Sequence, residues 1–238
     1  MKKYVRIIAA VLAVCAISLC LFACDKEELS KAASYDTSVT GKGTEIRIGS
    51  VLREIDSKKV TDFVPSDERS DFVLITVKDY GEIVITLRQD VAPITVENFK
   101  SLVADGFYNG TVFHRVMENF MIQGGGFVPD GNSLKQKEAE NIKGEFTANG
   151  VKNNLTHVRG VISMARVGGM NDSASSQFFI MHATTPDLNE QYASFGYVLA
   201  GMDVVDAIAT CAVDNPASQS PQPVENVIVE SMTFVQPK

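Results

Sequence analysis

The sequence predicts a mainly β domain that closes into an antiparallel barrel, and three observations support this fold class. Many short β-prone runs follow one another from about residue 71 to residue 235. Two helical segments interrupt them and lie far apart, which does not fit the strand–helix alternation of a βαβ sheet. Closing the sheet would also remove exposed strand edges. With 238 residues, 45% apolar and 21% charged, the chain can bury one good core.

The chain begins with a segment that resembles an export signal. The basic start MKKYVR precedes seventeen apolar residues that end at Ala23. Leu21 and Ala23 before Cys24 resemble the lipobox of bacterial lipoproteins, which implies a signal peptide over residues 1–23 and lipidation of the Cys24 thiol. An uncleaved anchor helix is the alternative, although the run is short for a full span. Either case predicts a protein outside the cytoplasm and attached to the cell membrane.

Residues 24–66 are polar and mixed in charge, and they predict a flexible tether after the lipidated cysteine. The run IRIGSVLREI within them carries a weak signal for a short ordered piece. We assign residues 67–238 to the folded domain. Of the four cysteines, Cys211 alone falls within it, so an intramolecular disulfide is excluded. Cys211 continues the apolar pattern of a helix and is expected to be a buried, inert thiol.

Charge and residue spacing exclude several classes of function. The net charge is −7, and the chain after residue 23 carries 19 basic against 29 acidic residues, or −10. Nucleic-acid binding depends on neutralising phosphates, so it is not expected. The three histidines lack the spacing of metal ligands, and they are expected to be structural. Gly124–Gly126 precede no Lys-Ser/Thr, which favours a close-approach loop over a phosphate loop. No coiled-coil pattern is present, so we expect a monomer.

The elements of the domain follow in order. The run 72–88, FVLITVKDYGEIVITLR, is a hairpin with a turn at Lys-Asp-Tyr-Gly. A helix over 92–106 has Pro93 near its start and Gly106 at its end, and a second helix covers 201–210. The remaining strands are expected at 111–117, 120–125, 160–166, 176–182, 194–200 and 224–235.

The run FHRVMENFMIQGG carries an arginine and a glutamine among apolar residues. A core strand needs neither, so the run indicates a functional site. If residues 118–120 form a three-residue turn, Arg115 falls opposite Gln123 and shares a face with Met121, with Phe120 at the rim. A two-residue turn would shift the register and break this cluster. The longer turn therefore predicts a pocket with an apolar floor, a fixed cation and an amide.

Five runs in this order resemble the cyclophilin family of peptidyl-prolyl cis-trans isomerases: FHRVMENFMIQGG, GEF at 144–146, GVISMAR, SSQFFI and FGYVL. The resemblance covers about residues 71–235. It implies an eight-stranded antiparallel β-barrel capped by two α-helices. It also implies rotation about Xaa-Pro bonds of polypeptide substrates, with no cofactor and no metal.

The resemblance assigns roles to residues of this chain. It makes Arg115 the catalytic residue. An apolar pocket for the proline ring is assigned to Phe120, Met121, Phe179 and Leu188. Two glutamines, Gln123 and Gln177, bind the substrate backbone and help to hold the arginine. Ala165 forms the groove wall that takes the residue before proline. Tyr192, where many members carry histidine, completes the predicted site.

The chain departs from well-known members at other positions. Asp187 aligns where many members have a tryptophan that supports cyclosporin binding, and the chain has no tryptophan. We therefore expect weak inhibition by cyclosporin. Arg166 aligns where many members have asparagine. Glu118 and Asn119 replace a common Pro-Gly, which changes the turn and not the pocket.

The sequence thus predicts a membrane-tethered isomerase that assists the folding of exported proteins. A non-catalytic proline-peptide-binding module or holdase is the alternative, and an adhesin-like scaffold is a third reading. The presence of Arg115 favours the enzyme, because binding alone does not require a donor aimed at the imide nitrogen.

Overall fold

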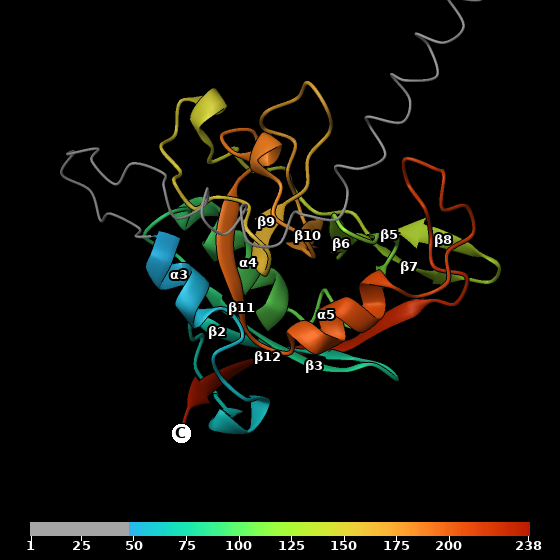
Figure 1. The fold of residues 1–238 in the computed structure, drawn as a ribbon, viewed down its shortest axis with the longest axis horizontal. Helices are drawn as coiled ribbons and strands as arrows, with labels where there is room; N and C mark the ends of the chain where they lie inside the picture. The colour runs from blue at the N-terminus through green and yellow to red at the C-terminus, as the bar shows by residue number, and fades with distance from the viewer. Residues whose placement is uncertain (1–47) are drawn as a thin grey trace, which may run out of the picture. The chain divides into compact units, whose positions relative to one another are not determined.

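The computed structural model describes residues 48–238 (Figure 1). Contacts divide the chain into the units Met1–Gly43 and Thr44–Lys238, and the described residues belong to the second. The predicted signal peptide, Cys24 and the tether up to residue 47 lie outside the described residues. Within residues 48–238 no helix has the length and apolar character needed to span a membrane.

The described part is mainly β, as predicted. Ten strands form one antiparallel sheet in the order β1-β12-β2-β3-β11-β9-β10-β6-β5, with β4 paired to β12 off this path, and β7 and β8 form a separate hairpin. The strands are β1 Phe63–Pro65, β2 Phe72–Val77, β3 Gly81–Leu87, β4 Val112–Phe113, β5 Arg115–Met117, β6 Met121–Gly124, β7 Phe127–Asp130, β8 Ser133–Gln136, β9 Val161–Met164, β10 Phe178–Met181, β11 Ser194–Ala200 and β12 Val227–Pro237.

The expected closed barrel of eight strands differs from this sheet in strand number and in closure. The hydrogen-bonded order is an open path from β1 to β5. One reason is that the run 111–117 is not a single strand. It breaks at His114 into β4 and β5, which pair with different neighbours, β12 and β6. A second reason is β1, which extends the sheet beyond β12.

Two of the helices agree with the sequence prediction. They are α4, Pro93–Ala104, and α5, Met202–Ala209. Pro93 occupies the first turn of α4, where its missing N–H leaves no donor unsatisfied. Both helices bury an apolar stripe against the sheet, and α5 contacts β3, β5 and β6 (Figure 1). Residues 48–238 also contain three 3-10 turns: η1 Val60–Asp62, η2 Thr147–Asn149 and η3 Pro186–Leu188.

Ordered structure begins before residue 67, where the sequence analysis placed a flexible tether. Helix α3, Ile48–Glu54, buries Val51, whose side chain is 1% exposed. The Asp56 carboxylate accepts hydrogen bonds from the backbone N–H groups of Gly201 (3.1 Å) and Met202 (3.2 Å), at the start of α5. Strand β1 then pairs with the end of β12. The segment 48–66 is therefore part of the folded unit.

Side chains of the central strands alternate between two apolar clusters. In β10, Phe178 and Ile180 join the main core with α4 and α5, while Phe179 and Met181 join a second cluster with Met121. Successive strand residues point to opposite faces, so the sequence Phe-Phe-Ile-Met supplies both clusters. The second cluster is the apolar base of the site described next.

Cys211 is half-buried beside Tyr80, rather than fully buried as expected. Burial raises the pKa of its thiol, which lowers the thiolate fraction at neutral pH.

Candidate active site

The site is built on the β5–β6 hairpin, whose register is the one that the longer turn predicts. Arg115 lies opposite Gln123 and Met117 lies opposite Met121, so the predicted three-residue turn is confirmed. Asn119 in this turn has a φ of 58°, a left-handed conformation that asparagine tolerates better than most residues. The Phe120 N–H donates to the Met117 carbonyl at 3.1 Å and closes the turn.

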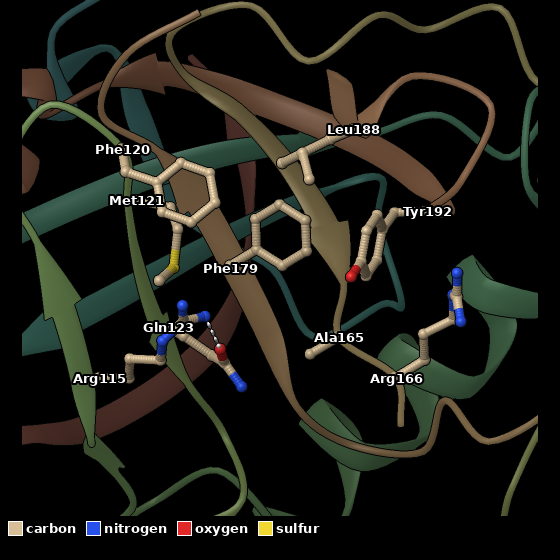
Figure 2. A pocket seen from close by; sticks show the side chains of 9 residues that line it. All are labelled: Arg115, Phe120, Met121, Gln123, Ala165, Arg166, Phe179, Leu188 and Tyr192. Atoms are coloured by element: carbon tan, nitrogen blue, oxygen red, sulfur yellow. Dashed lines mark hydrogen bonds between the residues drawn. The ribbon is translucent and has the colours of Figure 1, made fainter. Parts of the chain in front are cut away.

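Nine side chains line one pocket above this hairpin (Figure 2). They come from the β5–β6 hairpin with its turn, from β10, from the segment after β9 and from the loop around η3: Arg115, Phe120, Met121, Gln123, Ala165, Arg166, Phe179, Leu188 and Tyr192. The structure thus brings together every predicted substrate-site residue except Gln177, which is not part of the lining and contacts it through Gln123. Arg166 joins the lining although it was not among the predicted site residues, and Cys24 lies outside the described residues.

Arg115 is held by three contacts from different parts of the chain. Its Nε donates to the Gln219 carbonyl at 3.0 Å, its Nη1 donates to the Gln123 Oε1 at 3.3 Å, and its Nη2 contacts the Met117 Sδ at 3.3 Å. A guanidinium has five N–H donors in a rigid fork. Two of them therefore remain for a ligand in the pocket. Partial burial lowers the pKa of Arg115 from its usual value, yet a guanidinium stays charged at neutral pH.

A relay of two amides lies behind the arginine. The Gln123 Nε2 donates to the Gln177 Oε1 at 3.0 Å, which leaves the Gln123 Oε1 facing Arg115. Gln177 in turn crosses directly over Gly126, where a Cβ would lie 2.3 Å from the Gln177 Cγ. The glycine run is therefore a close-approach loop, as the sequence indicated. Gln177 acts on the pocket through Gln123.

The apolar part of the pocket combines a rigid base with a more open rim. Met121 and Phe179 are 1% and 5% exposed, and they belong to the second apolar cluster. Phe120, Leu188 and Tyr192 pack on this cluster and are partly exposed. The Tyr192 ring meets the Phe179 ring edge-on, with centroids 5.6 Å apart. A small apolar ring would find complementary surface here, next to the charged end of Arg115.

His157 supports this wall from behind and was not predicted as part of the site. Its ring stacks on Phe179 at 5.9 Å, and its two nitrogens lie 3.1 Å from the Asn189 Oδ1 and from the Ser163 Oγ. Asn189 also accepts the His157 backbone N–H at 2.8 Å. Burial lowers the pKa of His157 to about 4, so the ring is neutral at pH 7. It is the satisfied structural histidine that the sequence favoured.

This arrangement suits rotation about an Xaa-Pro bond. Rotation is slow because the nitrogen lone pair is delocalised into the carbonyl, and exchange takes tens to hundreds of seconds. In the twisted transition state the lone pair is localised on nitrogen. A donor aimed at that nitrogen stabilises the twisted state more than either planar state, which is the condition for catalysis. The free N–H groups of Arg115 can supply this donor while the apolar wall holds the proline ring.

Comparison with known proteins gives the same result. The family described as "Cyclophilin type peptidyl-prolyl cis-trans isomerase/CLD" matches residues 72–234. Peptidyl-prolyl cis-trans isomerase B of Escherichia coli is 44% identical over 164 residues, which cover 65% of this chain and 94% of the relative. Peptidyl-prolyl cis-trans isomerase A of Dickeya dadantii is 40% identical over 172 residues, or 70% of this chain and 85% of the relative.

A solved structure supports the fold. A cyclophilin-type isomerase of Cryptosporidium parvum, crystallised in the presence of the dipeptide Ala-Pro, is 28% identical and superposes with a TM-score of 0.57. The match covers 68% of this chain and 98% of the relative. With the hairpin register, the arginine-lined apolar pocket and these relatives in agreement, the chain belongs to the cyclophilin family and is a peptidyl-prolyl cis-trans isomerase.

Proposed function

We propose that this isomerase works outside the cytoplasm, attached to the membrane by a lipid on Cys24, and that it assists the folding of exported proteins there. The observation that carries the proposal is the start of the chain. A basic segment and seventeen apolar residues that end at Ala23 lead to Cys24, which is followed at once by Asp25-Lys26-Glu27. This order resembles that of a lipoprotein signal and its cleavage site.

The chemistry of the site fits such a role. Exported chains arrive unfolded, and their Xaa-Pro bonds populate both isomers, so isomerisation can limit the rate of folding. The rim of the pocket is formed by side chains that are only partly buried, so the pocket can accept a proline within a longer unfolded segment. The relative crystallised with Ala-Pro supports proline-containing peptides as the ligands of this chain as well.

Labelling with palmitate tests the anchor. Full-length protein expressed in a bacterial host should incorporate labelled palmitate and sediment with membranes. The Cys24→Ser variant should incorporate no label, because it lacks the thiol that carries the lipid. Label that persists in Cys24→Ser would show that the lipid is attached elsewhere. Wild-type protein that sediments with membranes without taking up label would show that the apolar segment is an uncleaved anchor.

A refolding assay tests the folding role separately. The protein should accelerate the slow, proline-limited phase of a denatured substrate protein. The acceleration should be mostly lost in Arg115→Ala, which removes the donor from the pocket. Arg69→Gln is the matched control, because it removes an arginine that pairs with Glu97 and does not line the pocket. An Arg115→Ala variant as effective as the wild type would favour a holdase that works by binding.

A further inference from the structure

Arg166 stands at the edge of the pocket opposite Arg115. It lines the pocket and lies on the outer side of Tyr192, while Arg115 and Gln123 lie at the other end (Figure 2). The side chain is half-buried. Arg166 is not part of the Gln123–Gln177 relay that holds Arg115, so its place in the pocket needs a separate explanation.

The guanidinium of Arg166 is held in place on two sides. Its Cζ lies 5.1 Å from the centre of the Phe146 ring and 4.9 Å from the centre of the Tyr192 ring. Its Nε donates to the Gln191 carbonyl at 3.0 Å, and its Nη1 approaches the Val167 carbonyl at 3.3 Å. No described residue accepts from its Nη2. The side chain is therefore fixed by backbone and rings, with donors left over.

The residues that line the pocket carry unbalanced charge. None of the nine lining residues is acidic, and two of them are arginines. Neither Arg115 nor Arg166 is part of the ion pairs found within residues 48–238. The chain as a whole carries a net charge of −7, so this pocket is a positive spot on an acidic protein. An uncompensated, fixed guanidinium beside an open pocket attracts a carboxylate ligand.

We propose that Arg166 makes this isomerase prefer substrates that carry an acidic side chain within two residues of the proline. The proposal depends on the isomerase activity and not on where in the cell the protein acts. An extended peptide advances about 3.3 Å per residue. A carboxylate one or two residues from a proline seated beside Arg115 is therefore displaced from that proline by roughly 3–7 Å along the peptide, and a peptide that follows the pocket carries it toward Arg166. The rings of Phe146 and Tyr192 cover part of the guanidinium, which reduces solvent screening of the attraction.

A purely structural role predicts a different outcome. Arg166 could simply pack on Phe146 and fix the loop through the Gln191 carbonyl. Its loss would then weaken turnover of all peptides alike, whatever their charge. The ratio of kcat/KM between an acidic peptide and its neutral isostere separates the two roles, because a general loss of activity cancels in this ratio.

The experiment uses pairs of proline peptides that differ by Glu against Gln, with the change placed at each of the two positions before and after the proline. For the wild type we expect a Glu/Gln ratio of about two to five at one position or more, the range of a partly exposed charge pair. The ratio should fall to about one in Arg166→Gln and stay above one in Arg166→Lys, which keeps the charge. Arg69→Gln, which lowers the net charge equally outside the pocket, should keep the wild-type ratio.

Salt provides a second readout that needs no variant. The wild-type ratio should shrink between about 10 mM and about 1 M salt, where the screening length falls from about 30 Å to about 3 Å. The proposal is overturned if the wild type shows a ratio of one at all four positions, or if Arg166→Gln keeps the wild-type ratio. A wild type that turns over no peptide of either kind would overturn the isomerase activity, and the proposal with it.

Discussion

Acidification should destabilise the domain through His157. The side chain is 1% exposed, and burial lowers its pKa to about 4 even though Asn189 favours the charged form. In the unfolded chain a histidine titrates near 6.5. Between these two values the unfolded state binds a proton that the folded state excludes. The free energy of unfolding therefore falls as the pH falls through this window, and the loss is complete below about pH 4.

The size of the effect follows from the two pKa values. A shift from 6.5 to about 4 corresponds to about 3 kcal/mol once both states are protonated. Over the narrower step from pH 7 to pH 5, the same linkage gives a loss of about 2 kcal/mol. Burial also lowers the pKa of His114 to about 4, so a second contribution of the same sign adds to the total.

Urea unfolding at pH 7 and pH 5 measures this loss, with His157→Gln as the comparison. Glutamine can still hydrogen-bond but does not titrate, so its loss between the two pH values should be smaller by about 2 kcal/mol. Comparing pH differences removes the general cost of the substitution, because that cost is present at both pH values. An equal pH dependence in wild type and variant would refute the assignment of this proton to His157.

Three further substitutions have defined outcomes. Gly126→Ala places a Cβ 2.3 Å from the Gln177 Cγ and should lower kcat/KM about tenfold through the amide relay, with about 1–3 kcal/mol of stability lost to overpacking. Unchanged peptide turnover would mean that the relay does not position the arginine. Met121→Ala, at the buried base of the pocket, should cost about 2–5 kcal/mol in urea unfolding, and a loss below about 1 kcal/mol would contradict its packing role. Asp56→Ala should lower the melting temperature by about 2–4 °C, because it removes the acceptor that caps α5. Asp56→Asn keeps an acceptor, so its melting temperature should fall less.

Strands and helices with strong local patterns were predictable from the sequence. The hairpin of β2 and β3 and both main helices follow from apolar periodicity bounded by turn residues. The hairpin of β7 and β8 was missed, because Pro129 and its polar neighbours show no alternation and its residues are mostly exposed. Sheet closure was predicted wrongly because the break at His114 depends on pairing with β12, more than a hundred residues later.

In the site, too, contacts set by local pattern were predictable from the sequence and contacts between distant segments were not. The partners of Arg115 within the hairpin follow from register, which a turn of known length fixes. The hydrogen bond from Arg115 to the Gln219 carbonyl joins residues 104 positions apart and uses a backbone atom. The type of side chain at position 219 therefore gives no sign of this contact in the sequence. The sequence shows that residue 157 is a histidine and residue 166 an arginine, but not where these side chains lie. Their places behind and beside the pocket depend on how distant loops fold, which local pattern does not encode.

The segment 48–66 is folded although its sequence gave only a weak signal for ordered structure. It lies outside the region matched to the family, residues 72–234, yet Val51 packs in the same apolar cluster as Met121 and Phe179. The Tyr197 hydroxyl donates to the Glu54 carboxylate, and burial together with this carboxylate raises the pKa of Tyr197 to about 12, so the donor persists at physiological pH.

Removing this segment would do more than shorten a spacer. A cut at residue 67 would expose the cluster beneath the pocket, uncap α5 and leave the end of β12 without its β1 partner. Each loss is of a kind that costs roughly 1 kcal/mol or more, and a small domain has only about 5–15 kcal/mol in total. The catalytic unit therefore starts at Ile48 or earlier, and activity measured on a shorter form would report on a destabilised pocket.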